Sequence, residues 1–193
     1  MGKIEVEIKG LSPLLMHSPK AMLIESETKV KSAKKTISKD DEAEQGAYRT
    51  SKGFLYVPST AIKGAMLNAC SFKKIKKYSL KPFVAGGVII PQEELDLLTY
   101  KNKPIRDYLI DSRTVVIPST QGRILKHRPK IPEWKLCFTL EYDEKVIGNT
   151  KEDIEIIKEV LSDAGNRIGI LDFRPQKSGS FGRFEITKWK VIA

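Results

Sequence analysis

Three segments within the first seventy residues carry patterns of apolar and polar positions that predict two strands and one helix. Ile4, Val6 and Ile8 alternate with charged residues, as expected of a strand with one buried face. A short second strand is predicted over residues 54–57, and Pro58 ends it. The apolar residues that follow recur at helical spacing and predict a helix that runs through Cys70: Ala61, Ile62, Ala65, Met66 and Ala69.

The middle of the chain predicts a strand, a loop and a hairpin. Residues 83–90 are apolar and interrupted by glycine, which predicts a strand, and residues 91–110 predict a loop. Thr114–Ile117 and Arg123–Leu125 flank a Pro-Ser-Thr-Gln-Gly turn sequence, which is typical of a β-hairpin.

The last sixty residues predict a strand, an amphipathic helix, a glycine-rich loop and a final strand. The strand is expected over residues 134–142 and the helix over 153–164. The glycine-rich loop runs from Gly165 to Gly182, and residues 183–191 form the last strand. The buried faces of this strand and helix are expected to carry Leu136, Phe138, Leu140, Ile154, Ile157, Val160 and Leu161.

The order of these elements predicts an α+β, ferredoxin-like (RRM-like) fold, in which two helices cover one face of an antiparallel sheet. We expect one domain over residues 1–193. Residues 25–53 are polar and rich in lysine, and they predict a flexible insertion. A β-hairpin is expected within residues 100–132, inserted between the two halves of the fold.

The composition admits a folded core and argues against a secreted or membrane-spanning protein. Of the 193 residues, 40% are hydrophobic, which suffices for a core. Cys70 and Cys137 lie in apolar stretches, and we expect both side chains to be buried. So few cysteines suit a protein of the reducing cytoplasm. The sequence after Met1 has no apolar signal-peptide core, and no run approaches about 18 apolar residues, so no membrane partner is expected.

The formal net charge of +10 predicts a polyanionic partner. Basic residues concentrate in segments 29–39, 73–81 and 123–135, whereas the outer face of the helix at 153–164 is acidic. Clustered Lys and Arg bind phosphates in a salt-dependent way, which favours single-stranded RNA or DNA without strong sequence preference. A basic surface that serves only solubility is the alternative. The segment 123–135 contains one acidic residue, Glu133, and five basic residues: Arg123, Lys126, Arg128, Lys130 and Lys135.

The glycine-rich loop is a second candidate for phosphate binding. Glycines let backbone N–H groups approach a phosphate closely, and neighbouring cations neutralise its charge. The spacing is not that of a Walker loop, so nucleotide hydrolysis is not predicted. Asp172 is expected to order the loop through a contact with Arg174. The basic residues of the loop are Arg167, Arg174, Lys177 and Arg183.

The segment from Val57 to Met66 joins a strand to a helix and resembles a known motif. Ser59 or Thr60 is the predicted N-cap, and Lys63 is expected near the same anion-receptive helix end. The stretch Val-Pro-Ser-Thr-Ala-Ile-Lys-Gly-Ala-Met resembles the Ile-Pro-Gly-Ser-Ser-Leu-Lys-Gly-Ala-Leu-Arg motif of the RAMP superfamily, which supplies backbone subunits of CRISPR effector complexes. The opening strand and turn through His17 and the glycine-rich loop at 165–183 are similar to further elements of that superfamily.

The resemblance implies a ferredoxin-like core, a projecting thumb hairpin and subunits that line up head to tail along one RNA strand. CRISPR effector subunits are then further candidate partners. In target-cleaving members of the superfamily an acidic loop residue supports metal-assisted cleavage, and the resemblance offers Asp40 and Asp41 for that role.

Little in the residues themselves points to catalysis. His17 follows a strand and an apolar run, which favours a packed or capping role over catalysis, and His127 lies among cations. No metal-ligand spacing is present, and neither a metal nor another cofactor is expected.

Three functions remain open on the sequence. The first is a non-catalytic nucleic-acid-binding subunit that multimerises, the second is a metal-dependent ribonuclease, and the third is a virus-encoded mimic that blocks or diverts a CRISPR effector complex. For the first, the candidate nucleic-acid contacts are His17, Lys63, Arg113, Arg123, Lys126, His127, Arg128, Lys130, Arg167, Arg174, Lys177 and Arg183.

Overall fold

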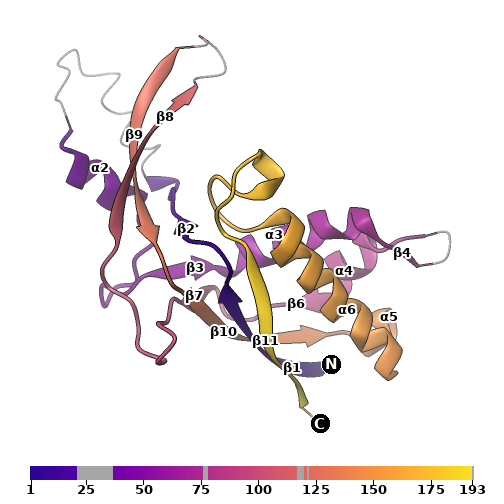
Figure 1. The fold of residues 1–193 in the computed structure, drawn as a ribbon. Coiled ribbons are helices and arrows are strands. Elements are labelled where there is room, and N and C mark those ends of the chain that lie inside the picture. Colours follow the sequence, from indigo (N-terminus) through magenta and orange to yellow (C-terminus); the bar gives the residue numbers. More distant parts are fainter. Residues whose placement is uncertain (21–36, 76–77, 117–119, 121, 193) are drawn as a thin grey trace.

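Four antiparallel strands form the main sheet, in the order β11–β1–β10–β6 (Figure 1). The structure is a computed structural model that describes residues 1–20, 37–75, 78–116, 120 and 122–192. Strands β1 and β10, which are the first and third of these four strands along the chain, lie at the centre of the sheet. This is the strand order of a ferredoxin-like fold. The strands are β1 (Gly2–Gly10), β6 (Val88–Ile89), β10 (Lys135–Tyr142) and β11 (Phe184–Ile192).

The longest helix of each half lies between that half's two sheet strands. Helix α3 (Ser59–Ala69) lies between β1 and β6 in the chain, and α6 (Lys151–Asp163) lies between β10 and β11. Helix α6 begins at a capping box in which Thr150 and Asp153 bond each other's backbone N–H groups. The resulting βαββαβ order confirms the predicted α+β, ferredoxin-like fold.

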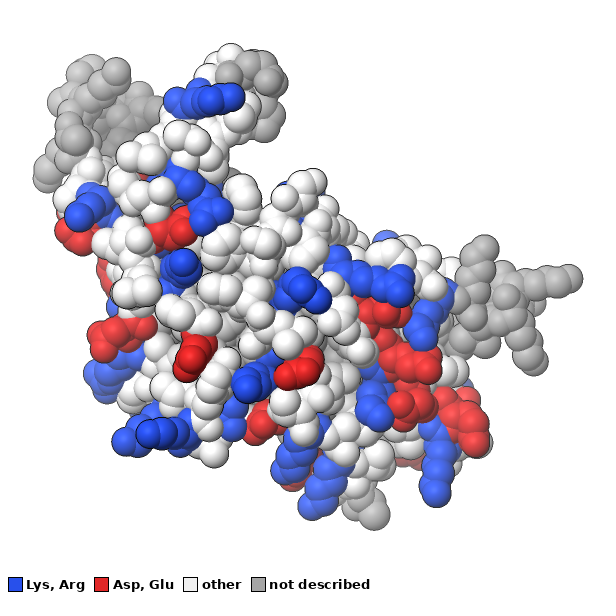
Figure 2. Space-filling model, viewed as in Figure 1, with Lys and Arg blue, Asp and Glu red and all other residues white. Residues whose placement is uncertain are grey.

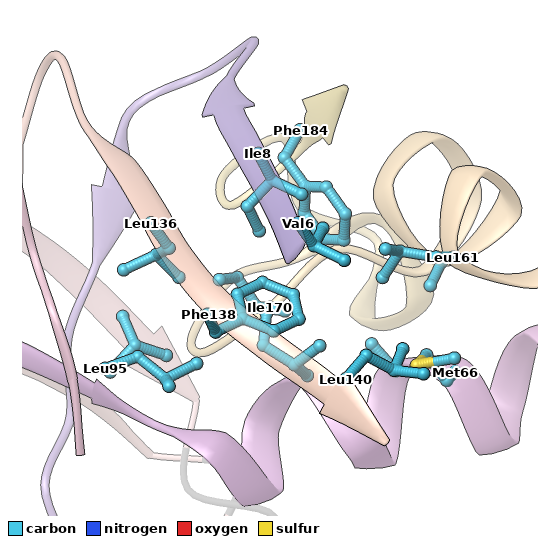
Figure 3. Packing of buried hydrophobic residues seen from close by; sticks show 14 of the residues in the cluster. Val6, Ile8, Met66, Leu95, Leu136, Phe138, Leu140, Leu161, Ile170 and Phe184 are labelled. Carbon is cyan, nitrogen blue, oxygen red and sulfur yellow. The ribbon is translucent and has the colours of Figure 1, made fainter. Parts of the chain in front are cut away.

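Apolar side chains of the sheet and the two helices form one core (Figure 3). Val6 and Phe138 come from the two central strands, Met66 comes from α3, and Leu161 comes from α6; all four are at least 95% buried. Because alternate residues of β1 and β10 point to this core, both helices cover the same face of the sheet. Burial of each such side chain stabilises the fold by about 1.5–3 kcal/mol.

The predicted hairpin is present and is longer than the sequence indicated. Strand β8 (Leu109–Val116) pairs with β9 (Arg123–Ile131), and the short strand β2 (Leu14–Leu15) pairs with the base of β9. Figure 1 shows the hairpin projecting from one end of the sheet. Residues 117–119 and 121 of the predicted turn lie outside the described residues.

The prediction of a flexible segment over residues 25–53 is wrong for its second half. Helix α2 (Lys39–Gly46) forms there, because Ser38 accepts a hydrogen bond from the Asp41 N–H at the helix start. Ala43 and Gly46 are buried, and the helix lies against β9. Residues 25–36 lie outside the described residues.

Two predictions in the middle of the chain are also wrong. The apolar run at 83–90 is mostly helix α4 (Lys81–Gly87), followed by the two residues of β6, because Pro82 suits the first turn of a helix. The expected loop at 91–110 contains β7 (Glu94–Asp96), which pairs with β3 (Tyr56–Pro58) and buries Leu95, and it contains the first two residues of β8.

Smaller corrections concern the ends of the long elements. Neither Ser59 nor Thr60 is the N-cap of α3; Pro58 holds that position and the Ser59 N–H donates to the Glu93 carbonyl. The glycine-rich segment is partly helical rather than a loop throughout. The remaining short elements are η1 (Cys70–Phe72), β4 (Lys74–Ile75), β5 (Tyr78–Ser79), α5 (Glu144–Ile147), the π-turn η2 (Ala164–Ile168) and the 3₁₀ turn η3 (Pro175–Lys177).

The sheet face opposite the helices carries cross-strand ion pairs. Glu5 lies 2.9 Å from Lys188, and Glu7 lies 2.8 Å from Lys135. These hydrogen bonds hold the carboxyl pKa values of both glutamates below their ordinary range. Lys135 is 7% exposed, so it does not belong to the basic surface of the hairpin as the sequence had suggested. Cys70 is buried as predicted, whereas Cys137 is exposed.

No helix in the described ranges is both long and apolar enough to cross a membrane.

Candidate functional site

A cleft of about 360 Å³ opens between helix α3 and the glycine-rich segment. Its walls come from parts of the chain that are distant in sequence: the second residue after β2, the second residue after α2, one face of α3, and residues 169–174. Its lining consists of His17, Tyr48, Thr60, Ala61, Gly64, Ala65, Asn68, Gly169, Ile170, Leu171, Asp172 and Arg174.

The α3 wall of the cleft presents backbone and small side chains. Thr60, Gly64 and Asn68 are spaced by four residues and therefore share one face of the helix. Apart from its chain neighbours and the backbone of its own helix, a Cβ atom built on Gly64 would meet no atom of the described residues within 4 Å. Glycine in a helix interior costs about 0.5–1 kcal/mol relative to alanine, and packing inside the protein does not require it here. The missing side chain leaves room in the cleft itself.

The opposite wall is a tightly turned backbone anchored in the core. Ile170 is 1% exposed, and its N–H donates to the Gly182 carbonyl. Gly169 and Gly182 have positive φ angles of 72° and 69°. Leu171 and Phe173 also adopt left-handed backbone angles, with φ of 58° and 52°. Such strained non-glycine residues cluster at functional sites, where the surrounding structure holds them.

A nearly buried ion pair joins this wall to the hairpin. The Arg128 Nη1 lies 3.1 Å from the Asp172 Oδ2, and the side chain of Arg128 is 9% exposed. The Arg128 Nε and Nη1 and the Asp172 Oδ2 have no hydrogen-bond partner within the described ranges, so the compensation is ionic. The sequence had assigned the contact of Asp172 to Arg174, and that assignment is wrong. The Arg174 guanidinium instead donates to the Leu171 carbonyl and to Gln176.

Aromatic residues of the glycine-rich segment pack against the same hairpin. Phe173 and Phe181 meet edge to face, with ring centroids 6.4 Å apart. The Arg113 guanidinium lies 4.9 Å from one ring and 4.7 Å from the other, and it forms a bidentate pair with Asp111. The Lys130 ammonium lies 5.9 Å from the Phe181 ring. These contacts fix the base of the hairpin relative to the cleft.

Three cations of the segment remain without an acidic partner within the described part of the chain: Arg174, Lys177 and Arg183. Lys177 and Arg183 are exposed, and the Arg183 Nε donates to the Asn166 carbonyl at 3.3 Å. Arg174 lines the cleft directly. Uncompensated positive charge therefore lies at and around the glycine-rich wall.

Helix α2 neutralises part of the charge that the sequence assigned to the hairpin. Lys126 lies 3.1 Å from a Glu42 oxygen, and the His127 Nε2 lies 4.0 Å from the other oxygen. The His127 Nδ1 is 2.7 Å from the Ser112 hydroxyl on the neighbouring strand. Arg123 is exposed near the far end of the hairpin. Of the hairpin cations, Arg128 contacts the cleft wall through Asp172.

Two further candidate residues point elsewhere. The Lys63 ammonium donates to the carbonyls of Val84 and Val88 at the end of α4, and burial lowers its pKa. It therefore caps α4 instead of lying free at the start of α3. Arg167 lies 3.3 Å from Asp163 and 5.0 Å from the ring of Phe72, and it does not line the cleft.

The acidic candidates occupy the first turn of α2. Asp41 accepts a hydrogen bond from the Ser38 hydroxyl, and both Asp40 and Asp41 are exposed. Acidic residues in this position stabilise a helix by interacting with its dipole. Within the described ranges, no group of three or more His, Cys, Asp or Glu side chains is arranged to hold a metal ion.

Charge is distributed unevenly over the surface. Figure 2 shows Lys and Arg along the projecting hairpin and a concentration of Asp and Glu over α6 at the other end of the molecule in that view. Lys73 and Arg167 neutralise Glu159 and Asp163 of that acidic face. The predicted separation of a basic hairpin from an acidic helix face is therefore present, although both faces are partly neutralised.

Sequence reasoning missed most of the cleft. It identified His17 and Arg174, but it did not identify Tyr48, Thr60, Gly64 or Asn68 as parts of one site. Burial raises the pKa of the Tyr48 hydroxyl. Gly64 could have been recognised from the sequence, because a glycine inside a helical pattern costs stability and therefore indicates a packing or functional role. The other contributions depend on contacts between distant parts of the chain.

The fold and the cleft together define an α+β, ferredoxin-like domain with a projecting hairpin and a glycine-rich wall. Among solved structures, 60 chains match it. One of them comes from the cryo-EM structure of the Type III-B Cmr-beta bound to cognate target RNA, with a TM-score of 0.59 and 13% sequence identity. The alignment covers 99% of this chain and 60% of that chain, so this protein spans about three fifths of its length. No protein-family model and no curated protein matches the sequence.

Proposed function

We propose that this chain is a non-catalytic subunit of the RAMP superfamily that binds single-stranded RNA largely without regard to sequence. The strand-to-helix motif at 57–66 supports the superfamily, and the similarity of the fold to a chain from an RNA-bound Cmr complex agrees with it. In this proposal the protein acts within a multi-subunit CRISPR effector complex, and neighbouring copies multimerise along the strand.

The open face of Gly64 is the observation that carries the proposal. A mid-helix glycine that costs stability, and that no contact among the described residues requires, lies on the α3 wall of the cleft. A ligand that approaches the α3 backbone closely would explain the glycine, because a larger side chain at position 64 would block that approach. The strained backbone across the cleft and the uncompensated cation of Arg174 suit a phosphodiester strand as that ligand.

The sheet face opposite the helices is a poorer candidate than the cleft for the RNA-binding surface. Sheets that bind RNA in RRM domains present aromatic side chains on which bases stack. Here that face carries the ion pairs of Glu5 with Lys188, Glu7 with Lys135, and Lys3 with Glu141. Charges that are already paired contribute little to phosphate binding, so the cleft is the favoured surface.

Replacing Gly64 by Leu should weaken RNA binding without weakening the fold. The new side chain enters open space in the cleft and improves helix propensity by roughly 0.8 kcal/mol, so the melting temperature should stay level or rise. Affinity for a single-stranded RNA should fall roughly tenfold or more, equivalent to about 1.4 kcal/mol. Titration of labelled RNA and thermal melting on the same preparation measure both effects.

Gly86→Leu is the matched control for this variant. Gly86 lies in α4, is exposed, and likewise has no atom within 4 Å of a built Cβ. It should gain similar stability and keep wild-type RNA affinity. Equal affinities for the two variants would remove the cleft from the proposal, and a wild-type protein that binds no RNA at low salt would refute the function itself.

Copies of the protein should line up along long RNA. Complementary basic and acidic surfaces at different ends of one chain favour open, head-to-tail contacts that repeat. Mixing the protein with single-stranded RNAs of increasing length should give particles whose length grows with the RNA, as seen by electron microscopy and light scattering. Particles of one constant size at every RNA length would contradict the arrangement.

A further inference from the structure

A second cleft, of about 370 Å³, adjoins the first one along helix α3. Asn68 lines both clefts, and the Arg174 that lines the first donates to the Gln176 that lines the second. The two clefts therefore form neighbouring parts of one track between α3 and the glycine-rich segment. Their volumes both fall in the range of sites that hold small organic groups, roughly 300–1,000 Å³.

The second cleft has a mixed lining, in which one part is apolar and includes an exposed aromatic ring. Leu67, Phe72 and Ile168 supply the apolar part, and Phe72 is 47% exposed. The Arg167 guanidinium lies 5.0 Å from the Phe72 ring, so a planar cation accompanies the aromatic surface. Aromatic rings and arginine planes are the groups on which proteins stack unpaired bases of single-stranded nucleic acids.

The rim of the second cleft offers unused hydrogen-bonding groups. The Asn68 Nδ2 donates to the Gly64 carbonyl, and the Gln176 Oε1 accepts from Arg174. Within the described ranges, no partner is present for the Asn68 Oδ1 or the Gln176 Nε2. An amide oxygen and an amide nitrogen in one cleft match the alternating acceptors and donors along the edge of a nucleobase. Lys81 adds a cation at the same cleft.

We propose that this second cleft is a nucleobase site, which takes one unstacked base of the single strand onto Phe72 while the first cleft holds the neighbouring backbone. The inference rests on the proposed RNA binding and adds the part of the RNA that this cleft recognises. Because every base has a flat face, such a site binds all four bases and favours the larger purines through stacking.

The experiment uses the full chain and an oligouridine that carries one 2-aminopurine, whose fluorescence reports stacking. Wild-type protein should change the fluorescence strongly and bind this strand more tightly than a strand with an abasic position. Phe72→Ala should abolish the fluorescence change and lower affinity for the purine strand roughly tenfold. Its salt dependence should remain that of wild type, because no phosphate contact is lost.

Two further variants separate stacking from a structural role of the ring. Phe72→Trp should restore the fluorescence change. Tyr100→Ala is the matched control, since Tyr100 is 39% exposed and also faces a cation, Lys9, at 4.3 Å, but lines neither cleft. That variant should behave as wild type.

The outcomes distinguish this inference from the proposed function. Wild-type protein that binds RNA with no fluorescence change, or a Phe72→Ala variant that loses the purine strand and the abasic strand equally, would overturn the base site and leave RNA binding intact. Absence of any wild-type RNA binding would overturn both.

Discussion

Replacing Asp172 by Ala should destabilise the protein by about 3–5 kcal/mol, the largest stability effect we expect from a single substitution outside the apolar core. The change leaves the Arg128 guanidinium, whose side chain is 9% exposed, without its counter-charge. No described group accepts a hydrogen bond from its Nε or Nη1. A buried charge without compensation costs far more than the intact pair contributes. Chemical denaturation at neutral pH measures the change in unfolding free energy.

The single substitution at the other partner of the pair, Arg128→Met, should cost less. Asp172 keeps 32% of its side chain exposed, and water can solvate its carboxylate once the arginine is gone. The double variant Arg128→Met with Asp172→Ala removes both charges and keeps most of the side-chain volume at position 128, so it should be more stable than Asp172→Ala alone. Strictly additive effects of the single changes would show that the two charges do not depend on each other.

The same pair explains how the hairpin is held. Arg128 lies on β9, and Asp172 lies on the cleft wall, where its N–H donates to the Leu15 carbonyl of β2. Arg113 adds stacking on Phe173 and Phe181 from the adjacent strand. Loss of the pair should therefore loosen the hairpin and the glycine-rich wall together, because both elements depend on this contact.

The ferredoxin-like core could be predicted from the sequence because its signals are local. Alternation in β1 and β10 and the apolar stripe of α6 each follow from the period of one element. Ile4, Val6 and Ile8 are at most 2% exposed, as the alternation required. The order of these elements along the chain then allowed few topologies.

Short apolar runs carried no such signal. The segment at 83–90 fits a strand or a buried helix equally well by pattern, and the structure divides it between α4 and β6. The Lys63 ammonium bonds the carbonyls at the end of α4. A contact of that kind depends on how α3 and α4 pack, which residue spacing along one helix does not contain.

The partners of individual charges could not be predicted for a related reason. Segment 123–135 looked uniformly basic, but Lys135 pairs with Glu7, Arg128 pairs with Asp172, and Lys126 pairs with Glu42. Each acid comes from a different part of the chain. In the glycine-rich segment, by contrast, Arg174, Lys177 and Arg183 have no acidic partner within the described residues.

Replacing Arg174, Lys177 and Arg183 together by Ala should reduce RNA affinity roughly hundredfold at about 0.1 M salt. Each phosphate contact on a single strand contributes about 0.7 to the slope of log affinity against log salt, so three contacts contribute about 2. The slope should become shallower by that amount. Titrations of a labelled single-stranded RNA at several salt concentrations measure both quantities.

The control removes an equal charge far from the cleft. Lys145, Lys151 and Lys158 lie on α5 and α6, and their replacement by Ala should change the slope little because no phosphate is expected there. A structural role of the loop cations predicts a different result. Arg174 bonds the Leu171 carbonyl and Gln176, and Arg183 bonds the Asn166 carbonyl, so the triple variant would then melt earlier. Earlier melting with an unchanged salt slope would assign these residues to the turn, whereas a shallower slope with near-normal melting would assign them to phosphate, because exposed cations contribute little to stability.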